Sequence, residues 1–104
     1  MPRVRILEAA ALEALEAAAW YEREQAGLGV DFEAAIQAAL DVLEADITPL
    51  ATMPGRAGRR GAKRLILRRF PFDVVVVARN SELIVIAFAH QSRRPGYWRG
   101  RLRT

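Results

Sequence analysis

The sequence contains no cysteine, only one lysine and only one histidine, His90. The lack of cysteine excludes disulfide bonds and thiolate chemistry, and a single histidine makes a structural zinc site unexpected. No stretch approaches the roughly 18 consecutive apolar residues of a membrane-spanning helix. The N-terminus lacks the apolar core of a signal peptide. We therefore expect a cytoplasmic protein that uses no metal and no cofactor.

The composition is that of one folded domain. The chain has 104 residues, of which 52% are hydrophobic and 27% are charged. This length suits a single hydrophobic core, and this balance is typical of folded rather than disordered proteins. The sequence shows no internal repeat and no low-complexity linker. We therefore expect residues 1–104 to form a single domain.

The charge is divided unevenly along the chain. Residues 1–52 hold three Arg and ten acids, whereas residues 53–104 hold thirteen Lys or Arg and two acids, giving net charges of −7 and +11. Two interpretations are open. Acidic helices offset a basic sheet within one fold, or the basic half presents a face to nucleic acid or to an acidic protein segment. Charge alone does not choose between these partners.

The first half predicts a short strand and a helix. Residues 3–7 alternate in the manner of a strand, and residues 8–26 are rich in alanine, glutamate and leucine, which favour a helix. Apolar residues recur along this helix at helical spacing, and aromatic residues follow near its end. The residues expected to be buried here are Leu12, Leu15, Ala19, Trp20 and Tyr21.

A second helix follows a glycine-containing turn. Gly27 and Gly29 bracket the turn, and Asp31 is expected to be a capping or first-turn acid. The predicted buried stripe of this helix consists of Phe32, Ile36, Leu40, Leu43 and Ile47. The two helices therefore form a helical hairpin. Pro49 and Pro54 end it, and residues 48–61 are expected to be an exposed basic loop.

The second half predicts three strands, over residues 63–69, 73–79 and 82–90. Val74–Val77 is apolar on both faces, which indicates a central strand, and Asn80–Ser81 is a tight turn between two strands. The fold class is therefore α+β: an N-terminal strand, a helical hairpin, and a three-stranded antiparallel meander with the helices packed on one face. We expect the N-terminal strand to join the sheet beside the meander.

The segment after the last strand gathers the chemically versatile side chains. Within nine residues it carries His90, Arg93, Tyr97 and Trp98. Together with Arg64 and Arg68, which face the side of the sheet away from the helices, these are the candidate functional residues. The two aromatic residues are expected either to fold back over the sheet edge or to stack on a ligand.

The chain resembles toxins of the RelE/ParE superfamily from bacterial type II toxin–antitoxin modules. The resemblance covers nearly the whole chain, and is closer to the ParE-like, plasmid-stabilisation branch. The residues that carry it are Trp20-Tyr21-Glu22, Gly27-Leu28-Gly29 with Phe32, Pro54-Gly55, Arg68-Arg69-Phe70-Pro71-Phe72, and His90 with Arg93, Pro95, Tyr97 and Trp98. The resemblance implies a small basic toxin that a flexible antitoxin segment wraps and neutralises.

This superfamily contains two activities on one fold, and fold does not decide between them. ParE-like members poison DNA gyrase by protein contact, whereas RelE-like members cut mRNA in the ribosome. Our first hypothesis is inhibition of DNA gyrase. The alternatives are a metal-independent mRNA endonuclease and a non-toxic binding module of the same fold. Each implies a complex with an antitoxin.

The roles of the candidate residues differ between these hypotheses. In a nuclease, His90 is the acid–base candidate and Tyr97 is a further catalytic candidate, and phosphate is bound by Arg64, Arg68 and Arg93. In a contact-dependent toxin, Arg64, Arg68, Arg93, Tyr97 and Trp98 bind the partner or target. His90 at a strand end also suits a structural hydrogen bond, and Arg93 also suits an ion pair with Asp73.

Overall fold

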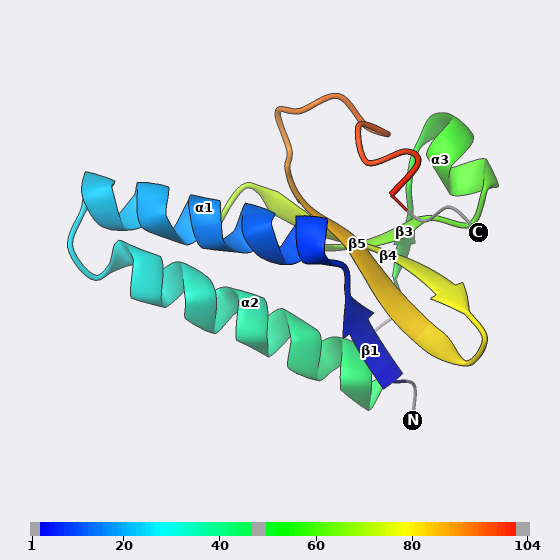
Figure 1. Ribbon diagram of the computed structural model, residues 1–104, viewed down its shortest axis with the longest axis horizontal. Helices are drawn as coiled ribbons and strands as arrows, with labels where there is room; N and C mark the ends of the chain where they lie inside the picture. The colour runs from blue at the N-terminus through cyan, green and yellow to red at the C-terminus, as the bar shows by residue number, and fades with distance from the viewer. Residues whose placement is uncertain (1–2, 47–49, 102–104) are drawn as a thin grey trace.

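The computed structural model describes residues 3–46 and 50–101, which form five strands and three helices around one mixed sheet (Figure 1). In chain order these elements are β1 (Arg3–Ile6), α1 (Glu8–Glu24), α2 (Leu28–Ala45), β2 (Ala51–Thr52), α3 (Gly55–Arg59), β3 (Lys63–Ile66), β4 (Phe72–Arg79) and β5 (Glu82–His90). The predicted α+β class and the order of strand, helical hairpin and strands are confirmed.

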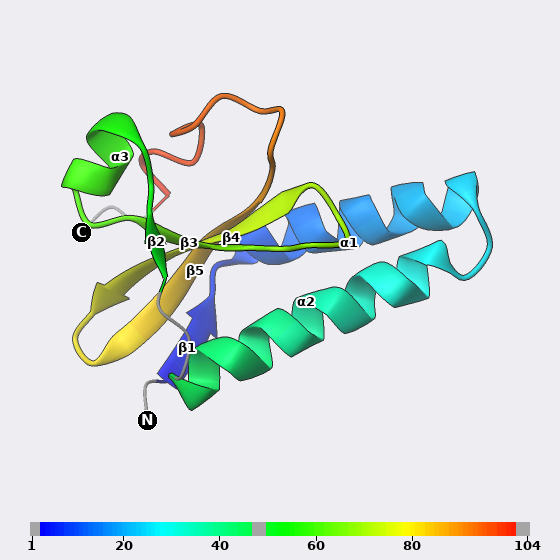
Figure 2. The ribbon, with the colours of Figure 1, turned by 180° about the vertical axis from the view of Figure 1, so that it is seen from behind.

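The sheet has the strand order β1-β5-β4-β3-β2. β1 runs parallel to β5, and all other neighbours are antiparallel. The predictions that β1 joins the sheet beside the meander and that the valine run is the central strand, β4, are both confirmed. β2 was not predicted. It lies in the segment 48–61, which we expected to be a loop and which also contains α3 (Figure 2).

The hairpin between β4 and β5 turns at Asn80 and Ser81, as predicted. Both residues have positive φ values, 51° and 64°, which two-residue hairpin turns require because their backbone twist matches that of the strands. Further along, Val75 pairs with Ala87 and Val76 pairs with Val85, so Ile86 is an extra residue in β5. This bulge shifts β5 by one residue relative to β4.

The α1–α2 corner is held by a glutamate rather than by the expected aspartate. Gly27 adopts a φ of 89°, and the Glu22 carboxylate accepts hydrogen bonds from the backbone N–H groups of Gly27 (2.8 Å) and Gly29 (2.9 Å). These groups lie at the start of α2, where backbone N–H donors have no partner within the helix. Asp31 lies in the first turn, as expected, and forms an ion pair with Arg69 at 2.9 Å.

The predicted buried stripe of α1 is wrong. Leu12, Leu15 and Ala19 are exposed, and the inward face is formed by Ala10, Ala14, Ala17, Ala18 and Tyr21. Both sets have helical spacing, so the sequence pattern favoured the larger leucines. Small alanines face inward because α1 packs closely against both α2 and the sheet. Trp20 is 51% exposed, against expectation, whereas Tyr21 joins the core as predicted.

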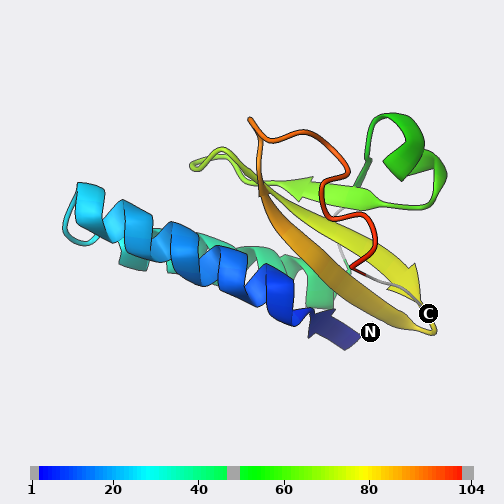
Figure 3. The ribbon, with the colours of Figure 1, turned by 45° about the horizontal axis from the view of Figure 1, so that its top comes forward.

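Two apolar clusters lie on opposite faces of the sheet. The first fills the space between the hairpin and the sheet and is centred on an aromatic group of Tyr21, Phe32, Phe70 and Phe72, whose ring centroids lie 5.0–6.3 Å apart. The second lies on the other face, where the C-terminal tail crosses the strands (Figure 3). Its buried residues are Met53, Ala62, Val75, Ile84, Ile86, Ala87, Ala89 and Trp98. The helices α1 and α2 therefore cover one face, and the tail covers the other.

Some element boundaries differ from the predictions. α2 ends at Ala45, and of its expected stripe Phe32, Ile36, Leu40 and Leu43 join the first cluster. Ile47 and Pro49 lie outside the described residues. β3 ends at Ile66, three residues earlier than expected, because the chain bends before it enters β4. No helix in the described ranges is both long and apolar enough to cross a membrane.

Candidate functional site

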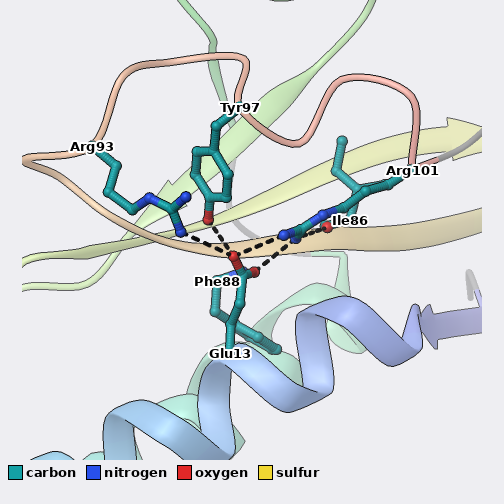
Figure 4. A network of polar contacts seen from close by, with 6 residues as sticks. All are labelled: Glu13, Ile86, Phe88, Arg93, Tyr97 and Arg101. Atoms are coloured by element: carbon teal, nitrogen blue, oxygen red, sulfur yellow. Dashed lines mark hydrogen bonds and ion pairs between the residues drawn. The ribbon is translucent and has the colours of Figure 1, made fainter.

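Glu13 of α1 is the centre of a polar network that fastens the C-terminal tail to the helical hairpin (Figure 4). Its carboxylate accepts hydrogen bonds from both Nη atoms of Arg101, at 2.8 and 3.0 Å, and from the Tyr97 hydroxyl at 2.5 Å. Arg93 lies at 3.7 Å from the same carboxylate. The Glu13 side chain is only 15% exposed. We call these four residues the Glu13 cluster.

The Glu13 cluster also closes an open edge of the sheet. β1 pairs with β5 only as far as Val85, so the later residues of β5 have no neighbouring strand on that side. Glu13 accepts a hydrogen bond from the backbone N–H of Phe88 (3.1 Å), and Arg101 donates one to the carbonyl of Ile86 (3.0 Å). Side chains thus satisfy the backbone groups that another strand would otherwise pair, which removes an exposed edge.

Tyr97 is held on both sides of its ring and at its hydroxyl. The guanidinium carbon of Arg93 lies 3.6 Å from the ring centroid, and that of Arg101 lies 5.2 Å away. Burial raises the pKa of Tyr97, and the hydrogen bond to Glu13 raises it further. The protonated phenol donates its hydrogen bond to Glu13.

Trp98 is only 6% exposed and belongs to the second apolar cluster. Its ring lies edge-on to Tyr97, with centroids 5.2 Å apart. Of the two roles left open for this ring, folding back over the sheet is therefore the one observed. In this conformation the indole has little surface to offer a partner.

His90, at the end of β5, faces the helical hairpin, on the side of α1. Its Nδ1 accepts a hydrogen bond from the backbone N–H of Ser92 (3.0 Å), which places the proton of the neutral ring on Nε2. The ring lies edge-on to Phe72 (5.1 Å) and borders a hollow of about 250 Å³ that also involves Ala17, Trp20 and Tyr21. The hollow beside His90 is thus mainly apolar and aromatic, and the backbone N–H of Arg93 donates a hydrogen bond to the His90 carbonyl (3.0 Å).

Arg64 and Arg68 have different environments. Arg64 of β3 forms an ion pair with Asp73 (3.2 Å), which is buried and also accepts a hydrogen bond from Gln91 (3.1 Å). Of the alternatives open for Arg93, the ion pair with Asp73 is not formed, because Arg64 and Gln91 occupy Asp73. Arg68 is exposed in the turn between β3 and β4 and makes no ion pair with any described residue.

The candidate residues do not form one site. Arg93 and Tyr97 meet at Glu13, Arg64 is committed to Asp73, and His90 faces an aromatic hollow. Sequence reasoning missed Glu13 and Arg101, although they hold the tail together. No local pattern distinguishes Glu13 from the other acids of its helix, since its partners follow it by 75 to 88 residues. Three side chains of the tail, those of Arg93, Tyr97 and Arg101, are bound to Glu13 within the chain.

An apolar groove runs between the two helices of the hairpin. It has a volume of about 360 Å³, and Phe88 of β5 and Phe32 of α2 lie at its base. The α1 side is formed by Ala11, Ala14 and Ala18, which are too small to fill the space opposite α2. Leu15, at the rim, is 64% exposed. Large apolar side chains from another chain would fit this groove.

Comparison with known proteins identifies the fold. No family model and no curated protein matches the sequence. Among solved structures, a chain described as "Chromosomal ParDE TA system from P. aeruginosa" matches with a TM-score of 0.65, covering 86% of this chain and 96% of that chain at 15% sequence identity. This protein has a ParE-like fold. The resemblance to the RelE/ParE superfamily is thereby confirmed at the level of the fold.

Proposed function

We propose that this chain is the toxin of a type II toxin–antitoxin system, that a cognate antitoxin neutralises it, and that it inhibits DNA gyrase by protein contact as ParE-like toxins do. The observation that carries the proposal is the ParE-like fold, shared over 86% of the chain with a protein of a ParDE TA system. The resemblance of the tail, from His90 to Trp98, points in the same direction.

The antitoxin binds in the groove of the helical hairpin. A segment of the antitoxin with a row of apolar side chains would fill the space beside Ala14 and cover Leu15. Arg68 is exposed on the basic half of the chain, makes no ion pair with a described residue and would attract acids of the same partner. This arrangement joins the two features expected of a wrapping antitoxin, apolar anchors and acidic side chains.

Gyrase is favoured over mRNA as the target because the nuclease candidates are not assembled. Cleavage by 2′-hydroxyl attack needs an acid and a base on either side of a phosphate, with cations beside it. Here the Tyr97 hydroxyl and the Arg93 guanidinium are turned to Glu13, and Arg64 is turned to Asp73. A contact surface needs no such convergence.

Inducible expression without the antitoxin tests the proposed target. We expect growth arrest with DNA-damage signalling and intact transcripts, and purified toxin should block supercoiling by purified gyrase. Rapid transcript cleavage that His90→Ala abolishes, in a folded variant, would replace gyrase inhibition by the mRNA endonuclease. Harmless expression of the folded chain would indicate a binding module without toxicity.

A matched pair of substitutions tests the antitoxin site separately. Leu15→Asp places a charge at the rim of the groove, whereas Val30→Asp places the same charge on a side chain that is 66% exposed and outside the groove. We expect Leu15→Asp to weaken antitoxin binding about a hundredfold, the scale of an apolar hot spot. Val30→Asp should bind as the unmodified toxin does. Equal affinities of the two variants would exclude the groove.

A further inference from the structure

Four arginines line one pocket beside the C-terminal tail. Unlike the Glu13 cluster, which the same tail helps to form, this pocket has no carboxylate in its lining. The pocket has a volume of about 210 Å³ and opens between α3, the end of β4 and the tail. The arginines are Arg56, Arg60, Arg79 and Arg99. Every residue lining this pocket is described by the structure, and none of them is acidic. Four positive charges therefore share a small volume without a negative one.

Arg79 supplies the decisive observation. Its Nη1 atom is buried and has no hydrogen-bond partner within the described part of the chain. Buried side-chain donors nearly always have an acceptor, and a charged donor without one is especially unfavourable. Glu82 pairs with Arg79 in the hairpin register, yet its carboxylate lies beside Arg5, at 3.6 Å, and does not line the pocket. A bound anion in the pocket would supply this acceptor.

The backbone around the pocket holds the arginines in place. Gly58 of α3 packs so tightly on the end of β2 that a Cβ atom there would lie 1.7 Å from the carbonyl oxygen of Met53. This contact fixes α3, and with it Arg56 and Arg60, against the sheet. In the tail, a Cβ on Gly96 would lie 3.1 Å from Nη2 of Arg99, so the glycine leaves room for that guanidinium. Close packing at Gly58 thus positions the segment that carries the exposed Arg56 and Arg60, and Gly96 makes room for the exposed Arg99.

We propose that this pocket binds a phosphate group. A phosphate monoester or inorganic phosphate carries a charge of about −1.5 to −2 at neutral pH and offers at least three acceptor oxygens. Arginine forks match such an anion, and several of them can bind one phosphate at once. A single carboxylate, with two oxygens and one charge, leaves most of the four arginines without compensation. The number of arginines therefore favours phosphate over a single carboxylate, and the small volume of the pocket, about 210 Å³, favours one compact anion over a peptide with several carboxylates.

The pocket has room for a larger molecule behind the phosphate. A second hollow of about 260 Å³, bordered by Pro54 and Pro95, shares Arg56, Gly96 and Arg99 with it. The ligand is therefore either free phosphate or the terminal phosphate of a nucleotide, whose remaining atoms would extend into this hollow. The proposal does not depend on the toxin function, because it concerns binding by the isolated chain.

Titration of the purified chain tests the proposal. Inorganic phosphate is added at constant ionic strength, balanced with chloride, while the arginine Nε–Hε resonances and the thermal midpoint are followed. We expect saturable shifts and a rise in the midpoint that chloride does not produce. Arg79→Gln and Arg99→Gln should each weaken phosphate binding about tenfold or more, the scale of a hydrogen bond to a charged group. Arg23→Gln, which removes the same charge from the distant end of α1, should change the affinity less than about twofold.

Two further ligands distinguish the alternatives. Adenosine 5′-monophosphate binding more tightly than inorganic phosphate assigns the pocket to a nucleotide terminus, and equal affinities assign it to free phosphate. The proposal fails if folded Arg79→Gln and Arg99→Gln variants both bind phosphate as the unmodified chain does. It also fails if a hexaglutamate peptide binds more tightly than either phosphate compound and loses affinity in the same variants. None of these measurements depends on toxicity, so the binding result can be judged separately from the proposed toxin function.

Discussion

The C-terminal tail takes part in two arginine clusters that differ in one respect, the presence of an acid. In the Glu13 cluster, Arg93 and Arg101 surround a carboxylate that is 15% exposed. In the pocket beside α3, Arg79 and Arg99 converge with two further arginines on a space that holds no acid. The first cluster is internally satisfied, and the second has a buried donor without an acceptor.

This difference assigns the two clusters different roles: the Glu13 cluster stabilises the fold, and the arginine pocket is the proposed ligand site. Glu13 provides hydrogen bonds to both the tail and the β5 edge, so the charges of its arginines stabilise the native state. Arg79 has a buried donor atom, Nη1, without an acceptor among the described residues. Removing a charged side chain from the Glu13 cluster should therefore destabilise the native state, whereas removing Arg79 from the pocket should stabilise it. Four predictions follow that contrast, beginning with the largest effect.

Glu13→Gln should lower the free energy of unfolding by about 3 kcal/mol, because it removes the acid from a mostly buried ion pair and leaves Arg101 uncompensated. Urea unfolding at pH 7 measures the loss. Glu16→Gln is the matched control, since Glu16 is exposed on the same helix and makes no ion pair with a described residue. A loss below about 1 kcal/mol for Glu13→Gln would show that the cluster does not hold the tail.

Tyr97→Phe should lower the free energy of unfolding by about 1.5 kcal/mol, because one hydrogen bond to a charged acceptor is lost while the ring stays between its arginines. The control is Tyr21→Phe, whose hydroxyl makes no hydrogen bond among the described residues. Thermal or urea unfolding of both variants gives the comparison. Equal losses would mean that the hydroxyl of Tyr97 contributes nothing specific.

Arg79→Met should raise the free energy of unfolding by about 1 kcal/mol in phosphate-free buffer, because it replaces an uncompensated buried donor by an apolar chain of similar length. Arg101→Met should have the opposite sign, since it removes the partner of Glu13. Chemical unfolding of the two variants measures both signs. If both substitutions destabilise the chain equally, the two clusters do not differ as we propose.

The smallest effect concerns high pH. Burial and Glu13 raise the pKa of Tyr97 above its ordinary value of 10.0, so the folded state holds the phenolic proton more tightly than the unfolded chain does. This stabilisation is complete below pH 10 and is lost as the pH rises above it. Between pH 9 and pH 11 we expect the unmodified chain to lose up to about 1 kcal/mol more than Tyr97→Phe, the partly exposed phenol being screened by solvent. Parallel slopes for the two proteins would contradict this coupling.

Periodicity and turn chemistry predicted much of the fold. The valine run indicated the central strand, Asn80–Ser81 indicated the hairpin, and the spacing from Phe32 to Leu43 indicated the buried face of α2. Each of these signals depends on neighbours in sequence. The buried face of α1 was not predictable in this way, because two sets of residues shared the helical spacing and the pattern favoured the leucines over the alanines.

The candidate site was predictable only as a segment. The sequence pointed to the tail as the place where His90, Arg93, Tyr97 and Trp98 gather, and both apolar and cationic roles were open for them. The structure assigns Trp98 to the second apolar cluster and Arg93 to Glu13. Neither contact has a signal in the local sequence, because the partners come from α1 and from the far face of the sheet.

By itself, then, the sequence determined the two long helices, the central strands, the α+β order and the division of charge between the two halves. These properties follow from hydrophobic spacing, turn residues and composition, which act over a few residues at a time. The tertiary structure alone decided which arginines meet an acid. Glu13 reaches across 88 residues to neutralise Arg101, whereas no acid reaches the pocket around Arg79 within the part of the chain that the structure describes. Packing decides this because the interaction of two charges depends on their distance in space and on their burial.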